Sequence, residues 1–289
     1  MRLGILCSGF LGENMLRKIY SKYQIDFIAT DKKSLNIIDF SKKKKIRCFV
    51  GNPREKKLIN HLKSFNCDVI ISINYLFLID KEIIDIAKIL AFNIHGSLLP
   101  RYRGRSPHVW AIINNEIKTG ITAHKIEEGC DTGPIISQIK LKINNNDTGG
   151  DLLSKFNLEY PRIIFETLEK IKNKTISFEE QNSSISTFFE KRNLSDGLII
   201  WGWWKERIYN WVRAQSCPYS GAFSYYENKK IIIDEITFVD EGYHNNFENG
   251  LIVKVLNNIP YIKTPNGIIK ITKIRNKESI IFKKLKKFL

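Results

Sequence analysis

The chain has 289 residues, which is enough for one large domain and one small domain. Its 46 Lys and Arg residues against 30 Asp and Glu give a net charge of +16, a balance typical of proteins that bind phosphates, nucleic acids or anionic membranes. Lys, Ile and Asn are frequent throughout, so part of this charge is compositional bias. The apolar run at the N-terminus is too short for a signal peptide, and no stretch has the roughly eighteen apolar residues of a membrane span. We therefore expect a cytoplasmic protein that makes no membrane contact.

The first half of the chain alternates short apolar runs with segments of helical periodicity. Helical spacing predicts helices over 12–23 and 55–65. The apolar runs predict strands over 3–7, 26–30, 47–50, 68–73 and 91–95. This alternation is typical of an α/β fold with a Rossmann-like, doubly wound and mostly parallel sheet, which binds ligands beyond the carboxyl ends of its strands.

A glycine-containing turn, Ser8–Gly12, follows the first predicted strand. It lacks the complete G-x-G-x-x-G pattern, so it predicts a tight strand-to-helix turn rather than a dinucleotide site. Five scattered cysteines without a C-x-x-C pair indicate neither a disulfide framework nor a zinc site, and they favour a reducing compartment.

The second half of the chain changes character after a long amphipathic helix predicted over 151–174. A polar stretch suggests a linker, and the region beyond it combines a predicted helix over 205–215 with β-rich segments over 221–238, 250–255 and 268–274. We therefore expect a catalytic domain at 1–178, a linker at 179–200 and a small β-rich C-terminal domain at 201–289. The basic segment 282–289 predicts a solvated terminal helix.

Two polar motifs fall at the expected edge of the sheet. In Asn93–Pro100, residues Asn93 and His95 are two positions apart on a predicted strand and so project from the same face. In Gly129–Pro134, a glycine-flanked turn carries Asp131. An imidazole that accepts a proton, a carboxylate that orients it and an amide that stabilises an oxyanion suit acyl transfer to an amine. A single histidine at a strand end is often merely structural, and we expect no nucleophilic role for Cys130, because no base lies near it in the sequence.

Several motifs in this order resemble the signature of the folate-dependent formyltransferase superfamily. They are Asn93-x-His95, Ser97–Pro100, Arg103-Gly104, Thr119–Thr122 and Asp131-x-Gly133. The resemblance implies an N-formyltransferase that uses 10-formyltetrahydrofolate as donor without a metal, and it implies that Asn93, His95 and Asp131 are the catalytic residues.

The same resemblance implies binding residues for the donor and for the amine acceptor. Those expected at the donor are Tyr75, Ser97, Leu98, Leu99 and His124. Those expected at the acceptor are Gly9, Arg103, Arg105, Arg213 and Tyr219.

Three features resemble the nucleotide-sugar N-formyltransferases most closely. The segment 103–112 is similar to their sequence after the catalytic histidine, and 187–223 is similar to the start of their C-terminal part, with Ile200 and Ser220 as departures. The segment 30–40 lacks the long basic insertion of the tRNA-specific enzymes.

These features imply a nucleotide-linked amino-dideoxysugar as acceptor, on thymidine diphosphate rather than uridine diphosphate, for lipopolysaccharide O-antigen or another surface polysaccharide. They also imply a homodimer that binds no nucleic acid. The alternatives are a methionyl-tRNA formyltransferase and a hydrolytic relative that passes the formyl group to water.

Overall fold

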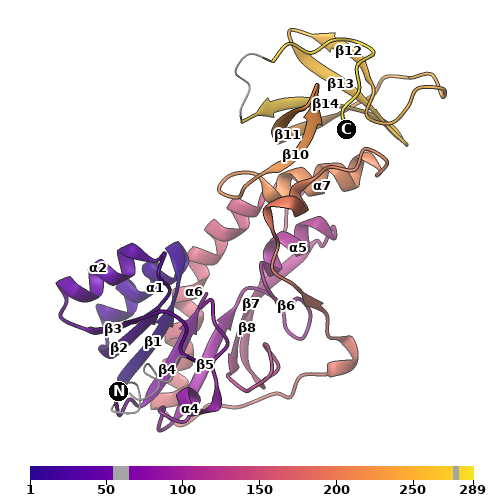
Figure 1. Ribbon diagram of the computed structural model, residues 1–289. Coiled ribbons are helices and arrows are strands. Elements are labelled where there is room, and N and C mark those ends of the chain that lie inside the picture. The colour runs from indigo at the N-terminus through magenta and orange to yellow at the C-terminus, as the bar shows by residue number, and fades with distance from the viewer. Residues whose placement is uncertain (55–64, 276–279) are drawn as a thin grey trace. The chain divides into compact units, whose positions relative to one another are not determined.

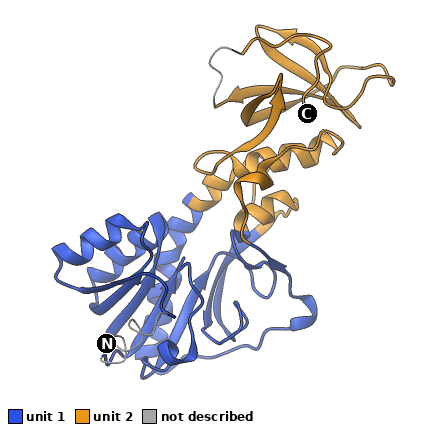
Figure 2. Ribbon diagram, in the orientation of Figure 1, with its two compact units in different colours: residues 1–107, 119–141, 154–190 blue, residues 108–118, 142–153, 191–289 orange. Residues whose placement is uncertain are grey.

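The computed structural model describes residues 1–54, 65–275 and 280–289. In these ranges the chain forms two compact units, shown in blue and orange in Figure 2. Unit 1 comprises residues 1–107, 119–141 and 154–190, and unit 2 comprises residues 108–118, 142–153 and 191–289. The predicted linker at 179–200 is thus divided between the two units, because its first part pairs with strands of unit 1.

Unit 1 is built on a sheet with the strand order β3-β2-β1-β4-β5-β7-β8 in the described residues (Figure 1). The strands from β1 to β5 run parallel, and β7 runs antiparallel to β5. The bounds are β1 Arg2–Cys7, β2 Gln24–Thr30, β3 Arg47–Val50, β4 Val69–Ile73, β5 Leu90–His95, β7 Lys118–Lys125 and β8 Ile135–Lys142. The predicted mostly parallel sheet is confirmed.

The central strands are mostly apolar because helices and loops cover both faces of a parallel sheet. All five residues of β4 are buried, as are the last five of β1. Helix α1 (Gly9–Tyr20) packs against β1 and β4, and α2 (Leu35–Lys43) packs against β2 and β3. Residues 55–64, which include nearly all of one predicted helix, lie outside the described residues.

Four further helices lie after β4 in the described chain, together with two short 3₁₀ turns. The helices are α4 Lys81–Ile84, α5 Pro107–Ile113, α6 Gly149–Lys172 and α7 Lys205–Gln215, and the 3₁₀ turns are Ser183–Ile185 and Leu194–Gly197. Helix α6 buries one face at four-residue spacing, with Leu152, Phe156 and Tyr160 all at most 3% exposed. The amide of Asn14 on α1 donates to Asn157 on α6 at 3.0 Å, so these two helices lie together.

Two short strands form a separate parallel pair in unit 1. Strand β6 (Arg103–Gly104) follows the turn after β5, and β9 (Phe188–Phe189) belongs to the segment after α6. Unit 2 contains an antiparallel sheet of the order β10-β11-β14-β13-β12 in the described residues. Its strands are β10 Ala222–Tyr226, β11 Lys229–Val239, β12 Ile252–Leu256, β13 Ile259–Thr264 and β14 Gly267–Ile274. The predicted β-rich C-terminal part is confirmed.

The predicted terminal helix over 282–289 is wrong. The segment runs extended along the sheet of unit 2, where the backbones of Leu289 and Tyr225 exchange two hydrogen bonds and Phe288 donates its N–H to Gly250. The rings of Phe282 and Phe288 are buried against Tyr226. Burying these two rings in the core of the sheet fixes the segment in the extended form, despite its basic amphipathic pattern.

Candidate active site

Strand β5 places Asn93 and His95 on one face at the carboxyl end of the parallel strands. Its antiparallel neighbour β7 sets His124 directly opposite Asn93 and Thr122 opposite His95. Residues opposite one another on adjacent strands share a face, so their side chains meet. The Nδ2 atom of Asn93 lies 3.0 Å from Nε2 of His124.

The hydrogen bonds of His124 determine how this pair is arranged. Its Nδ1 lies 2.8 Å from the carbonyl oxygen of Lys125, and a carbonyl only accepts, so we assign the ring proton to Nδ1. Nε2 then accepts a hydrogen bond from Asn93. The other amide hydrogen of Asn93 points to Oδ1 of Asp131 over a longer distance of 3.4 Å.

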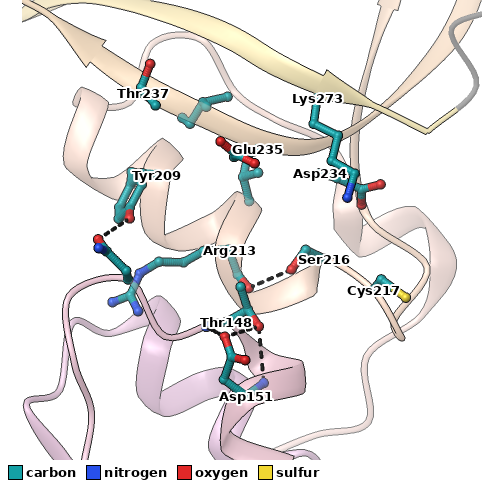
Figure 3. Close-up of a pocket in the computed structure, with 13 residues that line it drawn as sticks. Thr148, Asp151, Tyr209, Arg213, Ser216, Cys217, Asp234, Glu235, Thr237 and Lys273 are labelled. Atoms are coloured by element: carbon teal, nitrogen blue, oxygen red, sulfur yellow. Dashed lines mark hydrogen bonds between the residues drawn. The ribbon is translucent and has the colours of Figure 1, made fainter.

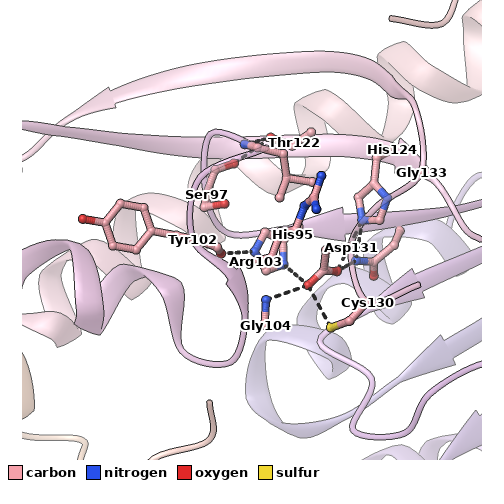
Figure 4. A network of polar contacts seen from close by, with 12 residues as sticks. His95, Ser97, Tyr102, Arg103, Gly104, Thr122, His124, Cys130, Asp131 and Gly133 are labelled. Carbon is pink, nitrogen blue, oxygen red and sulfur yellow. Dashed lines mark hydrogen bonds and ion pairs between the residues drawn. The ribbon is translucent and has the colours of Figure 1, made fainter. Parts of the chain in front are cut away.

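The imidazole of His95 is held between a carbonyl and a carboxylate (Figure 4). Its Nε2 lies 2.7 Å from the carbonyl oxygen of Tyr102, which assigns a proton to Nε2. In the neutral ring, Nδ1 is therefore the basic nitrogen, and it faces Oδ2 of Asp131 at 3.5 Å. The side chain of His95 is only 7% exposed, so water competes little for these contacts.

Asp131 lies in the turn between β7 and β8, and its φ of 54° is in the left-handed region that few residues other than glycine adopt. The backbone N–H of Gly104 donates to Oδ2 of Asp131 at 2.9 Å. Burial acts to raise the pKa of Asp131, but the positive charge that His95 and His124 carry when protonated, together with the Gly104 N–H, outweighs burial and holds this pKa well below its usual range. The carboxylate is therefore ionised at neutral pH.

Cys130 adjoins this carboxylate, with Sγ 3.6 Å from Oδ2 of Asp131. Burial and the negative charge of Asp131 raise the pKa of the Cys130 thiol to about 11. The thiol is thus protonated at neutral pH, and this environment disfavours nucleophilic catalysis.

The residues expected at the donor occupy three different surroundings. The hydroxyl of Ser97 donates to the carbonyl of Arg101 at 2.8 Å, and the N–H of Leu99 donates to Thr122 at 3.2 Å, so the turn after β5 is bound to β7. Leu98 in that turn is half-buried. His124 lies with Asn93 and Asp131.

Tyr75, also expected at the donor, follows β4 and packs in the apolar core of unit 1 beside Leu6 and Ala91. Its hydroxyl has no partner among the described residues, and burial raises its pKa. The place of Tyr75 in the core accounts for its aromatic ring, and its role at the donor stays a prediction.

Three of the residues expected at the acceptor lie in unit 1. The guanidinium of Arg103 donates to Oε1 of Gln181, and that of Arg105 donates to the carbonyl of Leu76. Gly9 has a φ of 64° and donates its N–H to Ser34 at 2.9 Å.

The other two lie in unit 2. Arg213 is buried and donates to Asn210 and to the carbonyl of Asp147; it lines a cavity of about 560 Å³ within that unit (Figure 3). Tyr219 is hydrogen-bonded to His108.

Sequence reasoning missed three contributors to the site. They are the carbonyl of Tyr102, the N–H of Gly104 and the side chain of Gln181. Two act through backbone groups, which no sequence pattern marks, and Gln181 lies in the stretch predicted to be a linker. Gly104 itself is the one signal visible in the sequence, because a glycine can mark a close approach of two backbone segments. A Cβ at this position would lie 2.2 Å from the carbonyl oxygen of Phe189.

Among the residues that the structure describes, no three His, Cys, Asp or Glu side chains are grouped as ligands for a metal ion. In the same part of the chain, no helix combines the length and the apolar character needed to cross a membrane.

Comparisons with known proteins place this site in a family. The formyl transferase model matches residues 29–168, and the model of the formyl transferase C-terminal domain matches residues 191–284. The bifunctional polymyxin resistance protein ArnA of Wigglesworthia glossinidia brevipalpis is 35% identical over 99% of the chain, which spans only 47% of that protein. The methionyl-tRNA formyltransferase of Thermodesulfovibrio yellowstonii is also 35% identical, over 79% of this chain and 72% of its own length.

A solved structure has the same fold at lower identity. It is the N-formyltransferase from Helicobacter canadensis, in complex with folinic acid and dTDP-3-aminofucose; it is 22% identical over 94% of this chain and 98% of its own, with a TM-score of 0.73. Both parts of the chain thus match formyltransferase models, and a relative of 35% identity is covered over most of its length. The chain belongs to the formyltransferase family.

Proposed function

We propose that this protein transfers a formyl group from 10-formyltetrahydrofolate to the amine of a nucleotide-linked amino sugar. The observation that carries the chemistry is the contact between Nδ1 of His95 and the ionised carboxylate of Asp131, with the amide of Asn93 beside them. This arrangement provides a base, a carboxylate that stabilises the base once it is protonated, and a hydrogen-bond donor for an oxyanion.

In the proposed reaction the neutral amine attacks the formyl carbon, and the carbonyl π electrons move onto oxygen. The tetrahedral intermediate carries its negative charge beside Asn93 and His95. The amide hydrogen of Asn93 that faces Asp131 makes the longer of its two contacts, at 3.4 Å against 3.0 Å, so it is the one we assign to the oxyanion. His95 accepts the proton that the ammonium nitrogen loses, and Asp131 stabilises the resulting imidazolium. The oxyanion then re-forms the C=O bond, the C–N bond to tetrahydrofolate breaks, and the imidazolium returns its proton to the leaving nitrogen.

The connection between β2 and α2 supports a small acceptor. It consists of residues 31–34, all of them described, and hydrogen bonds to the side chain of Asp31 hold it in a compact turn. The carboxylate of Asp31 accepts from the N–H of Lys33 at 2.8 Å and from the hydroxyl of Ser34 at 2.5 Å. This turn of residues 31–34 is too short to contain the long basic insertion that the resemblance assigns to the tRNA-specific enzymes at this position. The nucleotide sugar bound to the Helicobacter relative supports the same acceptor class.

Methionyl-tRNA is the second candidate acceptor. The net charge of +16 and the Thermodesulfovibrio relative favour it. Binding of tRNA through phosphate contacts would weaken steeply with salt, whereas a nucleotide diphosphate makes few such contacts.

The test is to incubate the protein with 10-formyltetrahydrofolate and a panel of thymidine- and uridine-diphosphate amino sugars, with methionyl-tRNA in parallel. Mass spectrometry then detects the addition of one formyl group. We expect a formylated sugar nucleotide and unmodified tRNA. Formylation of tRNA alone would contradict the proposed acceptor, and formate release without any acceptor would indicate hydrolysis.

The proposal extends to a thymidine nucleotide, to synthesis of a surface polysaccharide such as the O-antigen, and to a cytoplasmic homodimer. The same panel of amino sugars tests the nucleotide preference, and sedimentation of the purified chain tests the oligomeric state.

A further inference from the structure

One amide side chain in unit 1 joins the two loops that flank the catalytic carboxylate. The Oε1 atom of Gln181 accepts from Nε and Nη2 of Arg103 at 3.1 and 2.7 Å. Its Nε2 donates to the carbonyl oxygens of Asp131 and Gly133 at 2.8 and 2.7 Å. Both donors and both acceptor positions of the amide are used. Because a guanidinium only donates and a carbonyl only accepts, only one orientation of the amide is possible.

The segment that carries Gln181, residues 181–189, is attached to the same region at a second place; we call it the active-site strap. The N–H of Tyr102 donates to the hydroxyl of Thr187 at 2.8 Å, and the N–H of Arg103 donates to the Thr187 carbonyl at 2.9 Å. The ring of Phe189 stacks on that of Tyr102, with centroids 5.0 Å apart and planes 9° apart.

The strap therefore holds the backbone groups on which the catalytic side chains depend. The carbonyl of Tyr102 binds Nε2 of His95, and the N–H of Gly104 binds the carboxylate of Asp131. Gln181 fixes this loop through Arg103 and fixes the opposing turn through the carbonyls of Asp131 and Gly133.

We propose that Gln181 is a positioning residue that sets the distance between the Asp131 carboxylate and the His95 imidazole. The inference rests on the proposed function for the roles of His95 and Asp131, but it adds a residue and a segment to which the proposed function assigns no role. Without Gln181, the carbonyls of Asp131 and Gly133 lose their hydrogen-bond donor. Asp131, which has a φ of 54°, then loses one of the contacts that hold its backbone in place. Displacement of a catalytic group by about 1 Å costs roughly a hundredfold in rate.

Two substitutions separate the two halves of this contact. Gln181→Glu keeps an acceptor for Arg103 but presents oxygen to the two carbonyls, whereas Gln181→Met removes both sets of hydrogen bonds at similar length. We expect both variants to lower kcat by about 10- to 100-fold, with KM for the donor changed by less than about threefold. If Gln181 had a merely structural role, the substitutions would lower the melting temperature and the fraction of active protein. The folded fraction would not then combine a lower kcat with an unchanged KM.

The matched control is Ser184→Ala in the same strap. The Ser184 hydroxyl donates only to Asn182, and the residue is exposed. Its kcat should equal that of the unchanged protein. Folded Gln181→Glu and Gln181→Met proteins with normal kcat would overturn the inference.

Amide hydrogen exchange gives a readout that does not depend on transfer activity. The Gly104 N–H is protected by the Asp131 carboxylate, so it should exchange at least tenfold faster in Gln181→Met than in Ser184→Ala. Equal exchange would overturn the positioning role even if the wild-type chain formylates no acceptor. Absence of transfer by the wild-type chain, with faster exchange in the variant, would instead count against the proposed function alone.

Discussion

Nδ1 of His95 lies 3.5 Å from Oδ2 of Asp131, although one residue ends a parallel strand and the other belongs to a turn beyond the next strand of the sheet. The backbone N–H of Gly104 donates to the same carboxylate oxygen. In the proposed reaction, Asp131 thus interacts with a ring that gains a positive charge and with a fixed donor whose charge does not change. This division explains how the carboxylate can stay ionised while the imidazole beside it accepts a proton.

The low pKa of Asp131 predicts a specific pH dependence of stability. A carboxyl whose pKa is lower in the folded than in the unfolded protein stabilises the fold above its unfolded pKa, near 3.9, and that contribution is lost as the pH falls further. Thermal unfolding of the wild-type and Asp131→Asn proteins between about pH 6 and 2.5 checks this. The difference in melting temperature, wild type minus variant, should decrease below about pH 4, and a difference that stays constant over the range would be evidence against it.

Gly104 should tolerate no side chain. Its φ is 94°, and a Cβ would lie 2.2 Å from the carbonyl oxygen of Phe189. Gly104→Ala should therefore separate β6 from β9, move the backbone N–H away from Asp131 and lower kcat at least tenfold. Gly202→Ala is the control, because nothing lies within 4 Å of a Cβ at that position. Steady-state kinetics of both variants would show equal activity if the β6–β9 pairing were irrelevant to the site.

Cys130 should be dispensable. Its pKa of about 11 keeps the thiol protonated, and its contact with Asp131 is long at 3.6 Å. We expect Cys130→Ala to retain kcat within about threefold. We also expect alkylation of Cys130 by iodoacetamide, followed by peptide mass spectrometry, to become steadily faster with rising pH and to level off only near pH 11. Loss of activity by several orders of magnitude in the alanine variant would mean that the thiol takes part in the reaction.

The extended C-terminal segment should contribute strongly to the stability of unit 2. Phe288 is fully buried against Trp201 and Tyr226, so Phe288→Ala should cost about 3–5 kcal/mol in the free energy of unfolding. Ile281→Ala, at a side chain that is 72% exposed, should cost less than about 0.5 kcal/mol. Urea denaturation measures the free energy of unfolding of both variants. Similarly small losses of stability in the two variants would favour a solvated tail.

The sequence predicted the parts of the site that depend on local pattern. Asn93 and His95 are two apart on a strand, and this alternation alone places them on one face. The parallel sheet follows in the same way from apolar runs that are buried on both faces, such as Val69–Ile73.

The remaining features depend on contacts between distant segments. In the sequence, Gln181 is one polar residue in a predicted linker, since its three partner residues, Arg103, Asp131 and Gly133, come from loops far away in the sequence. Phe282 and Phe288 look like part of an amphipathic helix, but the ring of Tyr226 and the edge of the sheet determine their conformation. Single-residue patterns do not contain such pairings.

The central claim is that His95, held by Asp131, removes the proton from the attacking amine. The most direct measurement is single-turnover formyl transfer by the wild-type and His95→Ala proteins, with 10-formyltetrahydrofolate and the best acceptor from the panel. The two proteins should have the same melting temperature, so that a difference in rate does not reflect unfolding. We predict a loss of about 10²- to 10⁴-fold in the rate of transfer, with the variant still folded. Near-normal turnover by His95→Ala would contradict the assignment of the active site.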